Sequence, residues 1–136
     1  MKKLLLLNTE SLITSCTEYT DRIHRSDYIT TVTADEKSDE LKRMFNDIEY
    51  ISSLDKIILL LTKDVVDFGS LFIFLKIIKS GTDKLTILIS TSDIDESDEE
   101  ELDWIINAFS EYINILVCDD EDDLRSWFTQ TCKQYF

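Results

Sequence analysis

Five short apolar runs recur along the chain, each rich in Leu, Ile, Val or Thr and each bounded by polar residues. The runs cover residues 3–7, 28–33, 56–62, 85–91 and 113–118. Runs of this length and composition predict β-strands. The runs at 56–62 and 85–91 are almost continuously hydrophobic, which is typical of strands buried on both faces of a parallel sheet.

Helical patterns separate these runs, because apolar residues recur there at the i, i+3, i+4 spacing of an amphipathic helix. The stripes contain Leu12, Ile13, Cys16, Tyr19 and Ile23; Leu41, Met44, Phe45, Ile48 and Ile51; Leu102, Ile105, Ile106 and Phe109; and Leu124, Trp127, Phe128 and Cys132. Parallel strands need crossover connections, which helices supply. The alternation therefore predicts a single α/β domain over residues 1–136, a three-layer α/β/α sandwich. Its five-stranded, mostly parallel sheet has the predicted order 2-1-3-4-5.

A further helical segment, residues 65–78, is apolar almost all round, whereas an ordinary surface helix shows one polar face. Phe68, Phe72 and Leu75 share one side of this helix by their spacing, which predicts a self-association or partner surface, and so a possible homodimer. The alternative is a helix sunk in the core. Replacing Phe72 with Glu separates the two: loss of a dimer or partner by a folded variant indicates an interface, and unfolding indicates core.

Charge narrows the class of partner. The chain carries 28 acidic and 14 basic residues, a net charge of -14, and such a field repels nucleic-acid phosphates and anionic lipids. Direct binding to nucleic acid or membrane is therefore not expected. The acids concentrate in residues 93–103 and 119–123, each just after a predicted strand, where a helix dipole favours carboxylates.

Signals of cellular location are few. The apolar run that follows Lys2 and Lys3 has four leucines, shorter than the about 7 to 15 residues of a signal-peptide core. No stretch resembles the ~20 apolar residues of a membrane-spanning helix. The three cysteines are odd in number and never spaced as a CxxC pair, which predicts neither a disulfide framework nor a zinc site. We expect reduced thiols and a cytoplasmic protein.

The carboxyl ends of the strands are where an open α/β sheet places a ligand crevice. Carboxylates there offer candidate ligands for a hard cation such as Mg²⁺, and Lys63 offers a base that could meet a small anion. The candidate metal ligands are Asp64, Asp93, Asp119 and Asp120. The alternative role of these acids is helix capping and solubility. We expect no resident metal and no cofactor.

Other chemistries lack the residues they need. A calcium loop starting at Asp93 would have Asp98 in place of its glycine and Trp104 in place of its bidentate glutamate. Neither GxGxxG nor GxxxxGK[ST] occurs, so ordinary phosphate cradles are absent from the sequence. Trp104 and Trp127 fall in helical patterns and are expected in the core or an interface.

Two side chains that could act as a nucleophile or as an acid–base group are interpreted as structural. His24, the sole histidine, ends the first helical pattern, which places it away from the strand ends as an exposed or capping residue. Cys118 stands beside Asp119 and Asp120, whose charges should raise the pKa of its thiol and suppress its nucleophilicity. We therefore expect no catalytic residue.

The strand order and length resemble those of a response-regulator receiver domain. That resemblance implies an acidic pair after the first strand, an aspartate after the third, a hydroxyl after the fourth and a lysine after the fifth. The matching positions hold the stretch 8–10, Asp64, Thr91 and Asp119. An acid thus replaces the lysine, so the resemblance implies a fold and a regulatory role rather than phosphorylation.

In spacing, the chain also resembles the nucleotide-binding half of the tubulin/FtsZ superfamily. The strand at 55–62, the following helix and the strand at 85–91 match that family's strand, signature loop, helix and strand, and 115–120 matches its last strand. Where the family holds GTP phosphates, this sequence has Asp64, Asp67 and Phe68, which would repel or displace them. The resemblance implies a degenerate domain without the GTP motif, retaining a binding role.

Two functions follow from these observations. The first is a non-enzymatic acidic module that binds and regulates or inhibits another protein, either one with a basic surface or a filament-forming homologue. Its expected interface residues are Phe68, Phe72, Leu75, Asp95, Glu99 and Asp122. The alternative is a receiver-like regulatory domain that binds a cation or small anion at the carboxyl ends of the strands.

Overall fold

The computed structural model describes residues 3–32, 43–44, 46–61, 82–90, 96–111 and 113–135. Its five strands are β1 (Leu4–Leu7), β2 (Ile29–Val32), β3 (Lys56–Leu61), β4 (Leu85–Ser90) and β5 (Asn114–Cys118). They form one sheet in the order β2-β1-β3-β4-β5, and every adjacent pair is parallel. The predicted order is confirmed, and the described strand bounds lie within one residue of the predicted runs. The predicted end residues Thr33, Thr62 and Thr91 lie outside the described residues.

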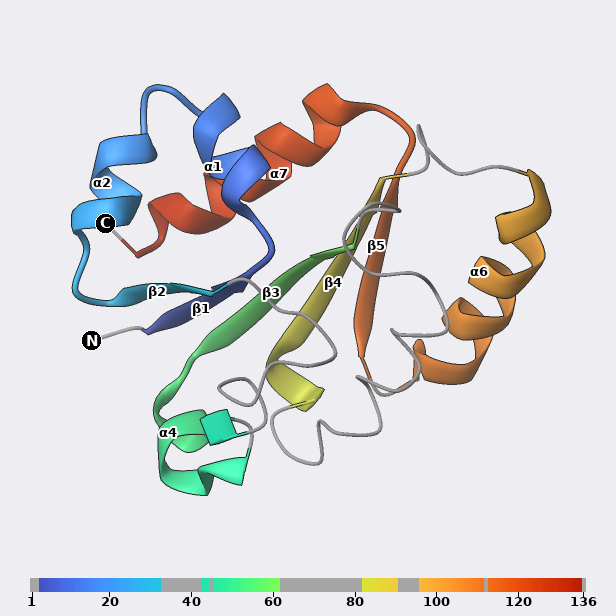
Figure 1. The fold of residues 1–136 in the computed structure, drawn as a ribbon, viewed down its shortest axis with the longest axis horizontal. Coiled ribbons are helices and arrows are strands. Elements are labelled where there is room, and N and C mark those ends of the chain that lie inside the picture. The colour runs from blue at the N-terminus through green and yellow to red at the C-terminus, as the bar shows by residue number, and fades with distance from the viewer. Residues whose placement is uncertain are drawn as a thin grey trace.

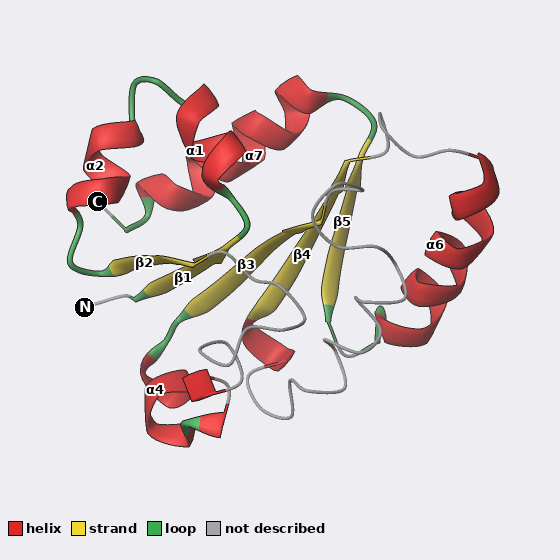
Figure 2. Cartoon of the chain, in the orientation of Figure 1, coloured by secondary structure: helices red, strands yellow, loops and turns green. Residues whose placement is uncertain are grey.

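Helices lie on both faces of this sheet (Figure 1). The described ones are α1 (Glu10–Ser15), α2 (Thr20–Arg25), α4 (Ile48–Ser53), α6 (Glu96–Phe109) and α7 (Glu121–Lys133). One hydrophobic cluster joins the sheet to α1, α2 and α7, and a second joins the opposite face to α4 and α6. Figure 2 shows the same separation of the helices around the strands. This arrangement is consistent with the predicted three-layer sandwich.

Alternate residues of the inner strands pack into the two hydrophobic clusters. Leu4 and Leu6 of β1 pack with α1 and α7, whereas Leu5 and Leu7 pack with the cluster of α4 and α6. All four leucines are fully buried, because successive side chains of a strand point to opposite faces. Burying each contributes about 1.5 to 3 kcal/mol relative to exposure, which explains why the run carries apolar residues at every position rather than at alternate ones.

The first helical stripe forms two short helices instead of the one helix its spacing predicts. α1 ends at Ser15 and α2 begins at Thr20. The Thr20 hydroxyl donates to two carbonyls of the preceding segment, Ile13 O at 2.7 Å and Cys16 O at 3.0 Å. A threonine hydroxyl that bonds local backbone competes with regular helix hydrogen bonding, so the chain bends here while Ile13, Cys16 and Ile23 stay buried.

The second stripe is also divided. Arg43, Met44 and Asn46 are helical, but Asp47 has an extended backbone and begins a new helix, α4. Its side chain accepts a hydrogen bond from the Tyr50 amide at 3.1 Å, the bond expected of an N-cap. The stripe predicted one continuous helix because apolar spacing carries no information about a cap inside it.

Several predicted features lie outside the described residues. They include the apolar helix 65–78 with Phe68, Phe72 and Leu75, and the acids Asp64, Asp93 and Asp95. The self-association surface therefore stays a prediction. Among the helices that the structure does describe, none has the length and apolar character needed to cross a membrane.

Candidate functional site

The carboxyl end of β1 holds the strained turn that starts α1. Asn8 adopts a positive φ of 57°, a conformation that asparagine tolerates better than most residues. Its backbone N–H donates to Val32 O at 3.0 Å, which ties this turn to the end of β2. Thr9 follows and is buried, and among the described residues its hydroxyl has no hydrogen-bond partner. The described part of this strand end therefore holds a residue with a positive φ and a buried hydroxyl, while the ligand crevice itself stays a prediction.

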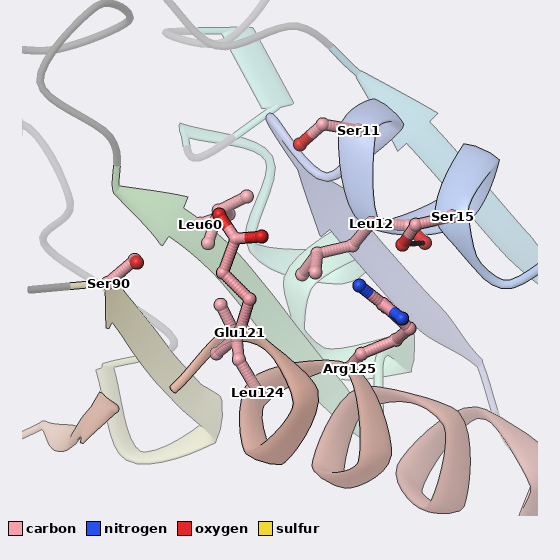
Figure 3. Close-up of a pocket in the computed structure, with 8 residues that line it drawn as sticks. All are labelled: Ser11, Leu12, Ser15, Leu60, Ser90, Glu121, Leu124 and Arg125. Carbon is pink, nitrogen blue, oxygen red and sulfur yellow. Dashed lines mark hydrogen bonds between the residues drawn. The ribbon is translucent and has the colours of Figure 1, made fainter. Parts of the chain in front are cut away.

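A small pocket opens at the same end of the sheet, between α1 and α7 (Figure 3). It is lined by Ser11, Leu12, Ser15, Leu60, Ser90, Glu121, Leu124 and Arg125. Glu121 and Arg125 stand four residues apart on α7, so their opposite charges lie on one side of that helix. The cavity volume is about 140 Å³, below the range of about 300 to 1,000 Å³ typical of ligand pockets. It can admit water or a small ion, but it is too small for a nucleotide.

Two of the four candidate metal ligands are described, and one of them caps a helix. Asp119 and Asp120 are both exposed, and the Asp120 carboxylate accepts a hydrogen bond from the Asp122 amide at 2.9 Å as the N-cap of α7. Within the described ranges, no group of three or more potential ligands gathers around one point. For Asp120 the capping alternative is therefore the one observed, while Asp64 and Asp93 lie outside the described residues.

His24 is exposed in the last turn of α2, as expected, and its side chain meets the first residue of α1. Its Nε2 lies 3.3 Å from Glu10 Oε1, and Glu10 opens α1 directly after β1. The break between α1 and α2 folds the two short helices together, which brings His24 back toward the start of α1. Both side chains are well exposed, at 44% and 65%, so water screens this pair strongly.

The Cys118 thiol has a raised pKa, as predicted, but for a different main reason. Burial raises the pKa most, followed by the nearby charges of Asp123 and then Asp119. Asp123 lies one helical turn into α7 and comes back beside Cys118 because α7 starts directly after β5. The thiol therefore stays protonated and poorly nucleophilic at neutral pH.

Exposed acids gather where α6 and α7 begin. α6 follows β4 along the chain and lies on one face of the sheet, whereas α7 follows the carboxyl end of β5 and lies on the other face (Figure 1). We call these exposed side chains the acidic surface: Glu99, Glu100, Asp103, Asp120, Glu121, Asp122 and Asp123. It contains two of the predicted interface residues, Glu99 and Asp122, and Asp122 also meets Arg125 Nη1 at 3.4 Å. The acidic runs that lie far apart in sequence thus reach the same end of the fold.

Trp104 was expected in the core or in an interface, and the structure excludes the core. It is 57% exposed, whereas Leu102 is buried and Ile106 and Phe109 pack partly into the core. Two residues along a helix correspond to a rotation of about 200°, so Trp104 points away from the face that carries Leu102. The phase of the apolar stripe could have shown this. Glu100 stands four residues earlier and shares the outward side of α6 with the indole.

Basic and aromatic side chains meet at the last turn of α7 and near its middle. Lys133 Nζ lies 5.1 Å from the centre of the Tyr19 ring, and the Arg22 guanidinium lies 5.9 Å from the same ring. Lys56 Nζ lies 5.1 Å from the Trp127 ring, which is half-buried. These contacts hold several of the described cations against aromatic faces. The acidic surface is therefore spatially separated from these cations.

No protein-family model matches the chain, and neither a curated protein nor a solved structure matches it. The resemblances to receiver domains and to the tubulin/FtsZ superfamily therefore stay predictions.

Proposed function

We propose that the protein is an acidic interaction module of the cytoplasm that binds, and thereby regulates or inhibits, another protein with a basic surface. The observation that carries the proposal is the exposed Trp104 on α6 beside the carboxylates of the acidic surface. An exposed large aromatic residue is typical of a contact that contributes strongly to binding. Tryptophan also attracts lysine and arginine through its ring face.

The charge of the chain supports a basic partner. A net charge of -14 accelerates the encounter with a positively charged surface and disfavours acidic competitors. Seven of the exposed acids form the acidic surface, three on α6 and four at the start of α7. No disulfide joins Cys16, Cys118 or Cys132, which supports a reducing compartment.

The test uses the protein as bait in a cytoplasmic lysate, at low and at physiological salt. A first variant reverses the three acids that α6 contributes to the acidic surface: Glu99→Lys, Glu100→Lys and Asp103→Lys. A matched variant makes the same charge change elsewhere on exposed positions: Glu18→Lys, Asp27→Lys and Asp83→Lys. The proposal expects one stoichiometric basic partner that the first variant loses and the matched variant retains.

A second pair of variants tests the aromatic contact. Trp104→Ala should weaken the same complex by about thirtyfold or more, since hot-spot residues cost at least about 2 kcal/mol when truncated. Ile48→Ala removes another exposed apolar side chain, which is 70% exposed on α4, and should leave affinity unchanged. Equal binding by all variants, or capture of no specific partner, would refute the proposal.

The pocket between α1 and α7 supports a second candidate, a regulatory domain that binds a small ion at the strand ends. Arg125 is the charged group there that could meet a small anion. Thermal melts with magnesium chloride, acetyl phosphate, ATP or GTP distinguish this candidate, because a ligand at 100 times its Kd stabilises by about 2.7 kcal/mol. A rise of several degrees that Arg125→Gln abolishes would favour this function over the first.

A further inference from the structure

β5 is an edge strand of the sheet, and its outer side has the properties of an edge that can pair with another strand. β5 stands last in the sheet order, and within the described part of the chain it pairs with β4 alone (Figure 2). Along any strand, alternate residues point their N–H and C=O groups to opposite sides. Part of the backbone between Asn114 and Val117 is therefore directed away from β4, where it can form a new ladder.

The side chains of β5 give this edge little protection. Proteins commonly guard an edge strand with lysine, proline or an inward-pointing charge, but the stretch from Ile113 to Cys118 has no charged residue and no proline. Val117 is 41% exposed, and Ile115 and Leu116 are half-buried. β2 at the other edge differs, because its two central residues are exposed threonines. The apolar character of the β5 edge thus needs an explanation.

Charge argues against a second copy of this chain as the occupant. An antiparallel pair of β5 strands centred on Leu116 would bring the acidic start of α7 in one copy toward Glu111, in the turn before β5, of the other. Glu111 and Glu121 are exposed, and like charges brought together at the ends of a strand pair destabilise it. Asp120, Asp122 and Asp123 would add repulsion at each end of such a dimer. The same carboxylates would attract lysine and arginine on a strand from another protein.

We propose that an extended, basic segment of the partner protein pairs with the outer edge of β5 as a sixth strand. This inference rests on the proposed function and specifies how the partner would be held. Backbone hydrogen bonds to the segment between Asn114 and Val117 supply affinity, as in other cases of strand addition. An apolar side chain of the partner covers Val117, and its lysine or arginine side chains meet Asp120, Asp122 and Asp123.

The probe is a fluorescent peptide of about nine residues, the length of a long strand, that alternates valine with lysine or arginine. Its binding is followed by anisotropy at two salt concentrations, and hydrogen exchange locates the contact. The proposal expects salt-sensitive binding and slower exchange of the β5 amides. A second peptide carries N-methyl groups on one edge, which keeps its charge but removes ladder hydrogen bonds. It should bind about tenfold more weakly.

A matched pair of variants on the two edge strands completes the test. Val117→Lys places a positive charge on the β5 edge and should weaken binding about fivefold. Thr30→Lys makes a similar addition of charge on the exposed part of β2 and should bind the peptide nearly as well as the wild type. Comparison of Val117→Lys with Thr30→Lys thus separates loss of the strand pairing from the general effect of an added charge.

Three outcomes would overturn the strand-addition proposal. They are equal binding by the two variants, equal binding of the N-methylated peptide, and no binding of the basic peptide at millimolar concentration. Self-association of the wild type that Val117→Lys abolishes would also overturn it, because β5 would then pair with a second copy. If the lysate partner depends on Trp104 and α6 while Val117→Lys has no effect, the proposed function stands and only this binding mode fails.

Discussion

Because the Cys132 thiol is buried, we expect the free energy of unfolding to fall as pH rises in the alkaline range. One substitution, Cys132→Ala, isolates this effect. Cys132 lies on α7, fully buried in the cluster that joins α1, α2 and α7 to the sheet. Burial, with a smaller contribution from Cys16, raises its pKa from 9.0 to about 12. Between these two pH values the unfolded chain loses the thiol proton while the folded chain keeps it, so stability is present below pH 9 and is lost as pH rises.

The magnitude follows from linkage. One pKa unit corresponds to about 1.4 kcal/mol, so at pH 10.5 the Cys132 thiol should have cost the wild type about 2 kcal/mol of its free energy of unfolding. Removing the sulfur with Cys132→Ala should cost about 1 kcal/mol at pH 7.5, similar to deleting one buried methyl group. At pH 10.5 the same substitution should therefore be neutral or stabilising.

Urea denaturation of both proteins under reducing conditions at pH 7.5 and 10.5 measures this change of sign. Leu124→Ala provides the control, because Leu124 is buried on the same helix but does not titrate. Its cost of about 2 to 5 kcal/mol should be the same at the two pH values. A difference between wild type and Cys132→Ala that does not vary with pH would refute the reasoning.

Three further predictions concern single side chains. Phe128→Ala should lower the free energy of unfolding by about 3 to 5 kcal/mol in urea melts, because this ring is fully buried. Asp47→Ala should cost about 1 kcal/mol in the same assay, because it removes the cap on the Tyr50 amide, whereas Asp47→Asn should restore most of it. Iodoacetamide at pH 8 should alkylate Cys118 more slowly than a model thiol, and Asp123→Asn should accelerate the reaction by lowering the raised pKa. An unchanged rate would contradict this assignment.

The strands could be predicted because each is marked by a short run of neighbouring apolar residues. Four consecutive leucines in β1 and the nearly continuous apolar run of β3 require burial on both sides, and only a central parallel strand offers that. The lengths of the intervening segments then required crossovers. The alternation of strands and helices predicted an open α/β sheet of the order β2-β1-β3-β4-β5, which is the order observed.

The helix breaks and the pocket were not predictable in the same way. The break between α1 and α2 depends on two hydrogen bonds of one hydroxyl, that of Thr20, and the apolar stripe continues across it. The pocket between α1 and α7 depends on segments more than a hundred residues apart. Cys16 Sγ contacts Thr129 Oγ1 at 3.1 Å across the same distance in sequence. Tertiary packing brings these residues together, and the spacing of apolar residues along the sequence gives no information about such long-range contacts.

Most described side chains of β1, β3 and β4 pack into one of the two hydrophobic clusters, so these strands offer few positions for a functional site. Specialisation can then occur at strand ends, at sheet edges and on the outward sides of helices. Among the described residues, large apolar side chains are exposed at three such places: Ile48 on α4, Trp104 on the polar side of α6, and Val117 on the edge strand β5. Exposed apolar side chains raise the risk of aggregation. Glu100 shares the outward side of α6 with Trp104, and Asp119 and Asp120 follow β5 directly along the chain, so the basic partner proposed above would meet carboxylates at both places. A partner that covered Trp104 and Val117 would bury apolar area that the isolated chain leaves in water.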